Sequence, residues 1–447
     1  MSRKLRVAVY DLARAPMETL TKRLNLSGLS VLSDEPMRLT AQSARPDADV
    51  WLNKWSFNLK APFLKDHKPK LGILTMTVGT DHIDMDAVSK HGLQIETCPS
   101  YCSNSVAEHA IALALRGSYK DSALPQLSPS QLLFTNLSDS SVEAAVAQIL
   151  FRIRQLDKSI ERAKAYDYGP SEIGRYAAPW SNQELLDKRI GIVGTNGSAK
   201  KLIKILKSGF GSHVLLHHSD IALESLGAVP FTCYEIGKSC AYVFLNDENI
   251  HFSDLLKIDA RRLEPSSYVL SGSKVAVLGA GKIGSRIAEI AKLGFDCDVT
   301  VFSRTEKPEL SEIGINFAAE LQTAISDAQF IFVALPLTAE TTNMLSASVL
   351  ASLDPSIPRV MVNVTRDKII DSEALYSAIE RGVISVYATD VLPNDTSLWV
   401  GNEPDGITSR FAVHPRVIAT PHEADSSVDS AERLASEVIE KLKTFKM

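Results

Sequence analysis

The sequence predicts an α/β protein of more than one domain, and three observations support this prediction. The chain has 447 residues, which is too long for a single hydrophobic core. Short apolar runs rich in valine and isoleucine alternate with stretches of helical periodicity, as expected for parallel sheets that are covered by helices. One such run leads directly into a glycine turn and a helix at residues 274–304, which is the layout of a βαβ unit.

The glycine turn within residues 274–304 predicts a Rossmann-type, doubly wound domain with a dinucleotide site. A buried strand is expected at 275–278, and the pattern Gly-x-Gly-x-x-Gly follows it immediately. The first glycine permits the tight turn, the second lets the backbone approach a pyrophosphate, and the third lets the helix pack closely on the strand. Free N–H groups at the start of the helix favour an anion there. The alternative is a purely structural glycine turn. The candidate pyrophosphate-binding residues are Gly279, Gly281, Lys282, Ile283 and Gly284.

The end of the second strand indicates which dinucleotide is bound. NAD sites usually have an acidic residue at this position for the ribose 2′-hydroxyl, but this chain has Ser303 and Arg304. A hydroxyl and a guanidinium suit a 2′-phosphate, which a carboxylate would repel. We therefore expect NADP(H) in preference to NAD(H), the alternative being that Arg304 is a solvated surface residue. Further cofactor contacts are expected from Thr305, Leu335, Pro336, Val364, Thr365 and Asp390, the last as a ligand of the nicotinamide amide.

The composition is that of an ordinary globular protein. Hydrophobic residues make up 45% and charged residues 23% of the chain, and the formal net charge is −5. No basic stripe suggests a nucleic acid partner, and no apolar run reaches the roughly 18 residues that a membrane span needs. The five cysteines show no metal-binding spacing, so no metal is expected, and no targeting segment is apparent. These features predict a cytoplasmic protein that acts on a small molecule.

A smaller α/β domain, flavodoxin-like in its expected fold, is predicted from residues 1–116 together with 424–447. Ligands in open parallel sheets bind beyond the carboxyl ends of the strands, and polar residues follow two strands of this domain. Gly79 would leave backbone N–H groups free for a carboxylate, and Lys54 would add a positive charge. The alternatives are a simple turn, a solvated lysine and, for Tyr101, core packing. The candidate substrate-binding residues are Lys54, Val78, Gly79, Thr80 and Tyr101.

The middle of the chain repeats the Rossmann-type unit in a degenerate form. Gly194 aligns with Gly279 at an offset of 85 residues, and further downstream Leu245 aligns with Leu335 at an offset of 90. A few residues of loop length account for the difference between the two offsets. The predicted boundaries are 117–139 for a linker rich in serine and proline, 140–272 for the degenerate copy, and 273–423 for the intact NADP-binding domain.

The degenerate copy is not expected to bind a cofactor. Asn196 replaces the second glycine and would place a side chain where the pyrophosphate has to lie. Ala199, in the place of the third glycine, is tolerated in such sites. His218 stands at the end of the second strand, where neither a basic residue nor a carboxylate is present.

Three polar residues follow successive strands of the intact domain: Arg366, Asp395 and His422. They would lie at the edge of the sheet where a nicotinamide is expected. Reduction of a keto acid needs a cation that holds the carboxylate and polarises the carbonyl, and arginine does this with a planar fork. It also needs an acid that delivers a proton, which histidine can do near neutral pH when a carboxylate orients it. This constellation predicts a hydride-transfer site, and the alternative is that each side chain is a satisfied structural group.

The sequence resembles the D-isomer-specific 2-hydroxyacid dehydrogenases in seven segments, which follow the order of that family: VGTDHIDMDAV, SNSVAEHAIALAL, VAVLGAGKIGSRIA, VALPLTAETTNM, VNVTRDKIIDSEAL, ATDVLPND and ATPHEA. Within the family it is similar to D-lactate dehydrogenases, formate dehydrogenases and hydroxypyruvate reductases. The resemblance implies an NADPH-dependent enzyme that interconverts a 2-keto acid and a D-2-hydroxy acid. It further implies that Arg366 binds the substrate, that His422 donates the proton, and that the amides of Val78 and Gly79 bind the carboxylate.

Two departures from the family pattern leave other functions open. Asp395 stands where the family has a glutamate, and Arg366-Asp367-Lys368 replaces the usual Arg-Gly-Gly. One alternative is an NADP(H)-sensing regulatory protein with weak or no turnover. Another is a dehydrogenase that oxidises formate-like or phosphorus-oxyanion substrates.

The inserted copy suggests that one chain takes the place of two subunits. The resemblance implies symmetric dimers, in which each subunit donates an arm that precedes its first Rossmann strand. Residues 140–186 are similar to that arm, and they begin with a stretch at 140–165 that predicts one long amphipathic helix. We therefore expect a pseudo-dimeric monomer, or otherwise a homodimer. A regulatory site on the degenerate copy is the competing hypothesis.

Overall fold

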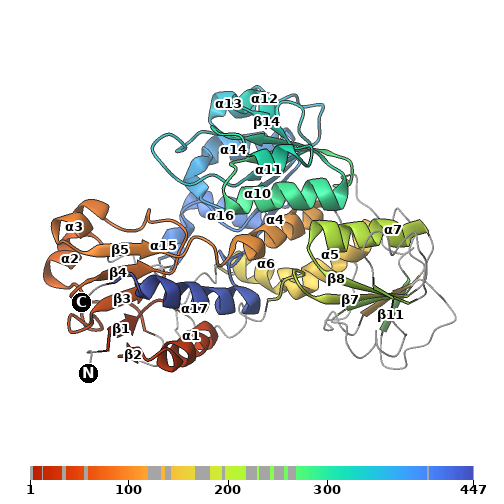
Figure 1. The fold of residues 1–447 in the computed structure, drawn as a ribbon. Helices are drawn as coiled ribbons and strands as arrows, with labels where there is room; N and C mark the ends of the chain where they lie inside the picture. Colours follow the sequence, from red (N-terminus) through yellow and green to blue (C-terminus); the bar gives the residue numbers. More distant parts are fainter. Residues whose placement is uncertain are drawn as a thin grey trace.

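Three parallel sheets with flanking helices make up the described part of the chain, and they confirm the predicted α/β class (Figure 1). The structure is a computed structural model. It describes residues 4–12, 14–32, 37–54, 59–118, 132–135, 142–166, 182–193, 197–217, 229–230, 242–245, 256–259, 268–399 and 402–445.

The N-terminal sheet has the flavodoxin-like order expected of the smaller domain. Its strands lie in the order β2-β1-β3-β4-β5, and all neighbours run parallel. The C-terminal helix α17 returns to this domain and packs against α1 and β4, because its apolar stripe needs a buried partner. The strands are β1 (Arg6–Val9), β2 (Ser30–Val31), β3 (Val50–Asn53), β4 (Gly72–Thr75) and β5 (Gln94–Thr97). The helices are α1 (Arg14–Leu26), α2 (Ala61–Asp66), α3 (Met85–Lys90) and α17 (Val428–Leu442).

The sheet of the intact unit has the Rossmann order with one further strand at its edge. Its strands lie in the order β14-β13-β12-β15-β16-β17-β18. All four residues of β15 and of β16 are buried, as a central parallel strand requires. The strands are β12 (Lys274–Leu278), β13 (Asp298–Phe302), β14 (Asn316–Ala318), β15 (Phe330–Val333), β16 (Val360–Asn363), β17 (Val386–Thr389) and β18 (Val417–Ala419). The helices are α10 (Lys282–Glu289), its π-helical continuation η5 (Ile290–Gly294), α11 (Pro308–Ser311), α12 (Leu321–Ile325), α13 (Ala347–Ala351), the 3-10 turn η6 (Asp367–Ile369), α14 (Ser372–Glu380), α15 (Asp395–Trp399) and α16 (Gly406–Val413).

The sheet of the degenerate unit has the order β11-β6-β10-β7-β8-β9. Its strand β6 (Leu132–Thr135) comes from the segment that was predicted to be a linker, and it pairs with β10 and β11. Beside β10 it holds the place that β16 holds beside β15 in the intact unit. The other elements are β7 (Arg189–Val193), α7 (Gly197–Ile203), the π-helical η3 (Lys204–Gly209), β8 (His213–His217), β9 (Val229–Pro230), β10 (Tyr242–Leu245) and β11 (Leu256–Asp259).

The two sheets correspond strand by strand with a slightly different offset from the expected one. Leu245 pairs with Val193, and Val333 pairs with Leu278 in the same manner. These strand ends therefore correspond at an offset of 88 residues (245 to 333), instead of the 90 expected from aligning Leu245 with Leu335.

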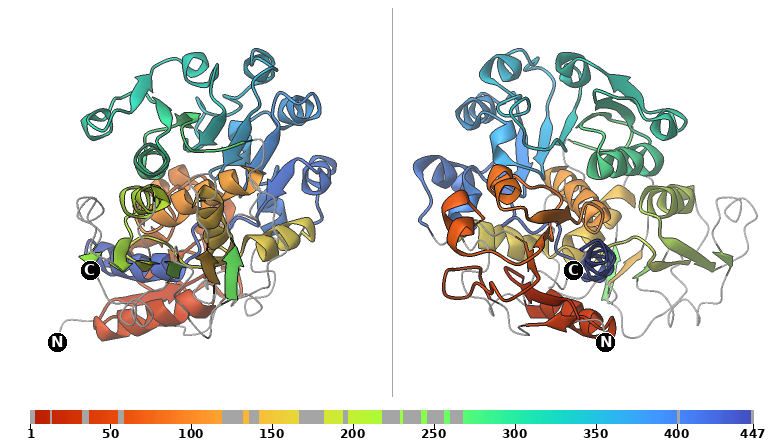
Figure 2. Two further views of the ribbon diagram at one scale, coloured as in Figure 1. Left: turned by 90° about the vertical axis from the view of Figure 1, so that its right-hand side faces the viewer. Right: turned by 60° about the vertical axis from the view of Figure 1, so that its left-hand side comes forward.

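Three helices lie in the middle of the molecule, between the intact unit and the N-terminal sheet: α4 (Ser103–Ser118), α5 (Val142–Ile153) and α6 (Leu156–Lys164) (Figure 2). The prediction of one long helix over residues 140–165 was wrong, because the chain turns at Gln155, whose φ is +47°. Helix α4 packs against α10, β16, β17 and α5, so it lies on the intact unit although it precedes the predicted domain boundary. Among the described helices, none combines the length and apolar character that a bilayer crossing requires.

Candidate active site

The glycine turn between β12 and α10 has the geometry that a close approach to a phosphate requires. Gly279 has a φ of +109°, and a Cβ added to it would lie 2.7 Å from the carbonyl oxygen of Ala334. A Cβ on Gly284 would lie 1.9 Å from the carbonyl oxygen of Gly279. A Cβ on Gly281, in contrast, would meet no protein atom within 4 Å. The first and third glycines are therefore fixed by packing, whereas the second faces open space where a pyrophosphate fits.

The other candidate cofactor residues lie at the carboxyl ends of neighbouring strands. Leu335 contacts the glycine turn, since its Cδ2 would be 3.2 Å from a Cβ on Gly279. Ser303 donates a hydrogen bond of 3.0 Å to the carbonyl oxygen of Thr305. Arg304 is exposed beside this turn. The backbone N–H of Thr365 donates to Asn363 Oδ1, 3.1 Å away. The remaining positions are the helix-initiating Lys282 and Ile283, the exposed Pro336 and the buried Val364.

His422 and Asp395 form a hydrogen-bonded pair at the same edge of the sheet. Nδ1 of His422 lies 2.7 Å from Oδ2 of Asp395, which is 2% exposed at the first residue of α15. The shorter aspartate side chain thus reaches the histidine. Burial alone would lower the pKa of His422, but the charge and the hydrogen bond of Asp395 outweigh it, so the pKa lies above its usual value. The raised pKa favours the protonated form of the imidazole.

Arg366 is held in a bidentate ion pair with Asp81 of the N-terminal domain. Nε and Nη2 of Arg366 lie 2.9 and 3.0 Å from the two carboxylate oxygens of Asp81. Burial would raise the pKa of Asp81, but the hydrogen bond and charge of Arg366 lower it below the usual value. The sequence predicted no role for Asp81, which follows β4. Its carboxylate engages the guanidinium in the fork geometry that a substrate carboxylate would use.

The predicted carboxylate-binding turn lies beside this ion pair. A Cβ on Gly79 would be 3.5 Å from Nη2 of Arg366, and Val78 is 44% exposed. Thr77 fixes the turn by donating to the carbonyl oxygen of Gly79, 2.7 Å away. The structure therefore brings Gly79, which lies between Val78 and Thr80, next to Arg366, although the two residues belong to different domains.

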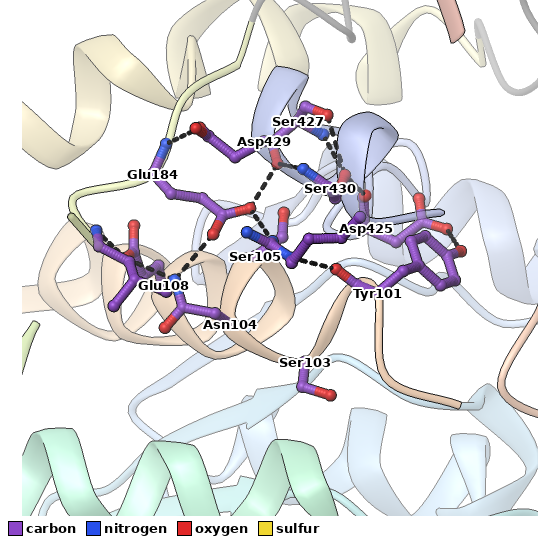
Figure 3. A network of polar contacts seen from close by, with 12 residues as sticks. Tyr101, Ser103, Asn104, Ser105, Glu108, Glu184, Asp425, Ser427, Asp429 and Ser430 are labelled. Atoms are coloured by element: carbon purple, nitrogen blue, oxygen red, sulfur yellow. Dashed lines mark hydrogen bonds and ion pairs between the residues drawn. The ribbon is translucent and has the colours of Figure 1, made fainter. Parts of the chain in front are cut away.

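Lys54 and Tyr101 meet at a partly buried aspartate for which the sequence predicted no role. Nζ of Lys54 lies 2.9 Å from Oδ2 of Asp425, and the hydroxyl of Tyr101 donates to the same oxygen at 2.7 Å (Figure 3). Lys54 is 6% exposed, which rules out a solvated lysine. Burial raises and the Lys54 charge lowers the pKa of Asp425, with a net decrease. The pair thus ties the N-terminal domain to the segment that follows His422, and direct contact of either side chain with substrate stays a prediction.

Asp390 lies beneath the histidine loop. Its carboxylate accepts hydrogen bonds from Thr420 Oγ1 at 2.5 Å, from the N–H of Glu423 at 3.0 Å and from the N–H of Ala424 at 2.8 Å. Burial raises the pKa of Asp390 to about 7, opposed by His422 and by these hydrogen bonds. The observed partners make it a support of the loop, and its role toward a nicotinamide stays a prediction.

The diagnostic residues of the degenerate turn, Gly194, Asn196 and His218, lie outside the described residues. Ala199 is described and is 1% exposed in α7, as expected for packing against a strand. Within the described ranges, no group of three or more histidine, cysteine, aspartate or glutamate side chains is placed to hold a metal ion.

Comparisons with known proteins show what the chain is similar to. Residues 250–424 match the family described as "D-isomer specific 2-hydroxyacid dehydrogenase, NAD binding domain". The 2-hydroxyacid dehydrogenase homolog 1 of Schizosaccharomyces pombe is 26% identical over 272 residues, which cover 57% of this chain and 77% of that protein. The glyoxylate reductase of Pyrococcus furiosus is 31% identical over 180 residues, which cover 40% of this chain and 50% of the relative. Apart from homolog 1, the chain thus spans about half the length of relatives of this kind.

Solved structures resemble the fold of nearly the whole chain. D-lactate dehydrogenase from Aquifex aeolicus matches with a TM-score of 0.54 at 19% identity, covering 98% of this chain and 95% of that one. An NADPH-dependent glyoxylate/hydroxypyruvate reductase from Sinorhizobium meliloti matches with a TM-score of 0.55 at 17% identity, covering 99% and 93%. At these identities the solved structures show the fold alone, whereas the family match indicates common descent. Residues 250–424 therefore resemble the NAD-binding domain of the D-isomer-specific 2-hydroxyacid dehydrogenases, and the relatives and the shared fold support this family for the chain.

Proposed function

We propose that the protein is an NADPH-dependent reductase that interconverts a 2-keto acid and a D-2-hydroxy acid. The observation that carries this proposal is the His422–Asp395 pair, with Nδ1 and Oδ2 2.7 Å apart, at the sheet edge that also holds Arg366. A cation and a protonated imidazole at the end of a dinucleotide-binding sheet are the two groups that carbonyl reduction needs from a protein. The bound dinucleotide supplies the hydride.

Arg366 binds the substrate carboxylate in this proposal. In the structure its fork is engaged by Asp81, whose side chain is 30% exposed. An entering carboxylate takes the place of Asp81, so one bidentate pair is exchanged for another. The backbone N–H groups around Gly79, a residue beside the same guanidinium, also donate hydrogen bonds to the substrate carboxylate.

His422 delivers the proton to the carbonyl oxygen. Its Nδ1 is engaged by Asp395, so the transferred proton is the one on Nε2. Asp395 holds the imidazole in one orientation and stabilises the imidazolium, which is the reason for the raised pKa of His422. After transfer the neutral imidazole is reprotonated from solvent.

The preference for NADPH rests on Ser303 and Arg304 at the end of β13. Neither residue carries the negative charge that would repel a 2′-phosphate, and Arg304 is exposed just beyond the end of β13. Lys307 follows in the same loop and donates to Ser285 Oγ of α10 at 3.0 Å, which adds positive charge to this side of the site.

A panel of 2-keto acids assayed with NADPH and with NADH tests the proposal. Glyoxylate, pyruvate and hydroxypyruvate cover small side chains, and we expect turnover of at least one of them with the higher kcat/KM for NADPH. His422→Gln should lower kcat by roughly 100-fold or more while NADPH fluorescence titration stays unchanged. NADPH binding without turnover across the panel would instead identify a cofactor sensor, and oxidation of formate or phosphite would identify the other alternative.

A further inference from the structure

The intact and degenerate units meet through reciprocal contacts. A Cβ on Gly209 of η3 would lie 2.9 Å from Cα of Gly294, and a Cβ on Gly294 of η5 would lie 3.0 Å from Cα of Gly209. The next residues, Phe210 and Phe295, pack edge to face with ring centroids 6.2 Å apart. Both pairs are separated by 85 residues, as are β7 and β12 (189 to 274). Contacts that repeat with the two partners exchanged are the property of an isologous interface.

A second reciprocal pair lies where the chain enters each unit. Glu108 of α4 accepts hydrogen bonds from the N–H groups of Leu185 at 2.7 Å and Leu186 at 3.0 Å, just before β7. Figure 3 shows Glu108 in this network together with Asn104 and Glu184.

Glu143 of α5 makes the corresponding contacts before β12. It accepts from the N–H groups of Leu270 at 2.8 Å and Ser271 at 2.9 Å, which are again 85 residues beyond Leu185 and Leu186. Helix α4 packs on the intact sheet and α5 packs against α7. Each helix thus caps the entry of the unit that it does not belong to, as two subunits exchange contacts across a dimer axis.

The segment α5–α6 reaches from the degenerate unit to the histidine loop of the intact unit. Helix α6 packs against β18 and α16. Nη1 of its Arg162 lies 2.7 Å from Oε2 of Glu423, and Ser159 donates to the other oxygen of the same carboxylate. Arg154, which is fully buried at the end of α5, donates to the carbonyl oxygen of Ala424 at 2.8 Å.

These contacts hold a backbone conformation that the histidine does not favour. His422 has a φ of +55°, in the left-handed region that a residue with a side chain adopts only when its surroundings impose it. The carboxylate of Asp390 accepts hydrogen bonds from the N–H groups of Glu423 and Ala424. The segment α5–α6 binds the Glu423 side chain and the Ala424 carbonyl oxygen. Glu423 is 4% exposed, so its carboxylate needs the partners on α6.

We propose that the segment α5–α6, with Arg162 and Arg154 as positioning residues, fixes His422 toward Asp395, and that the degenerate unit thereby supplies from within one chain what a second subunit would supply in a symmetric dimer. The inference rests on the proposed function in that His422 is taken as the proton donor. This role in positioning His422 explains why the degenerate unit keeps its packing against the intact unit although its cofactor turn is degenerate.

The test removes the Arg162 charge and compares it with a matched cation on the same helix. Arg162→Met should lower kcat for the 2-keto acid that the wild type reduces by about tenfold, with the KM for NADPH unchanged. Arg162→Lys should restore most of the rate, because it can still reach the Glu423 carboxylate. Lys164→Met is the control, since Lys164 is exposed on α6, and it should leave kcat and KM unchanged. A lower kcat in Lys164→Met, or an unchanged kcat in Arg162→Met, would overturn the proposal.

A double-mutant cycle and a titration separate this inference from the proposed function. If Arg162 acts through Glu423, adding Glu423→Gln to Arg162→Met lowers kcat no further, and additive losses would contradict the mechanism. The NMR titration of the His422 imidazole, assigned with His422→Gln, needs no turnover. Its pKa should fall toward 6.5 in Arg162→Met, because the ring leaves Asp395 while Asp395, Asp390 and Arg366 are all still present. Loss of a nearby positive charge alone would raise this pKa, so a rise or no change also overturns the proposal.

Discussion

The intact and the degenerate unit share the face through which they pack and differ at the edge that faces a cofactor. On the shared face, Gly209 and Gly294 occupy equivalent positions at which neither backbone leaves room for a Cβ. At the other edge, the intact turn has Gly281, whereas the degenerate turn has Asn196 in the sequence. Packing between the units and cofactor binding therefore depend on different residues of the same fold. The packing can be kept where cofactor binding is lost.

The two sheets also differ in the strands whose carboxyl ends would face a cofactor. The intact sheet continues from β15 through β16, β17 and β18, whose carboxyl ends lead to Arg366, Asp395 and His422. The degenerate sheet takes β6 from earlier in the chain beside β10 and then ends with β11. Within the described residues, the degenerate sheet has no strand in the place of β18, whose carboxyl end leads to His422 in the intact unit.

Exchanging the second residue of the glycine turn is expected to have the largest effect. Gly281→Asn gives the intact turn the residue of the degenerate one and fills the open space beside Gly281, so NADPH affinity should fall by roughly 100-fold or more. Asn196→Gly in the degenerate unit is the matched variant and should leave the stoichiometry at one NADPH per chain. Isothermal titration measures both, and a second site created by Asn196→Gly would contradict the scaffold role of that unit.

Removing the carboxylate beside His422 is expected to change the pH dependence. Under the proposed function, reduction needs the protonated imidazole of His422, so we expect the rate to fall as pH rises through its pKa, which lies above 6.5 in the wild type. In Asp395→Asn the two largest causes that raise this pKa are lost, while burial still lowers it and only the charge of Asp390 still raises it. The falling limb then moves to lower pH, and at a pH above both pKa values kcat/KM should drop about tenfold for every whole pH unit by which the limb moves. A pH–rate profile measures this, and an unmoved limb would assign it to another group.

A substitution in the shared face should affect stability without affecting cofactor binding. A Cβ in Gly294→Ala would lie 3.0 Å from Cα of Gly209, so the two backbones have to separate, and we expect a loss of about 1 kcal/mol in the free energy of unfolding. Gly406→Ala, where a Cβ meets nothing within 4 Å, is the control and should be neutral. Urea unfolding compares the two, and equal stabilities would show that the units are not in close contact there.

The smallest expected effect concerns the mass of the protein in solution, which should not change with protein concentration. Because the face that would join two cofactor domains is already used inside one chain, sedimentation equilibrium should give the monomer mass of 48.8 kDa across protein concentrations. A dimer that dissociates on Gly294→Ala would show that this face joins separate chains instead.

Local pattern was sufficient for the elements whose residues are neighbours in sequence. The glycine turn, the strand at 275–278 and the positions of Arg366 and His422 after strands could all be predicted, because each depends on a period or spacing within one βαβ unit. The break at Gln155 could not, because a continuous apolar stripe spans both α5 and α6. Strand β6 could not either, because its partners β10 and β11 lie about 110 residues or more away in the sequence.

The sequence by itself determined the fold class, the single intact dinucleotide turn and the residue types available for catalysis. Only the tertiary structure decided how those residues are held. It pairs Arg366 with Asp81 across 285 residues, Tyr101 with Asp425 across 324, and Arg162 with Glu423 across 261. Such pairs depend on how whole domains pack, and a single sequence carries no local period or spacing that marks them. The charge of a side chain follows from the sequence, whereas its interaction partner is determined by the fold.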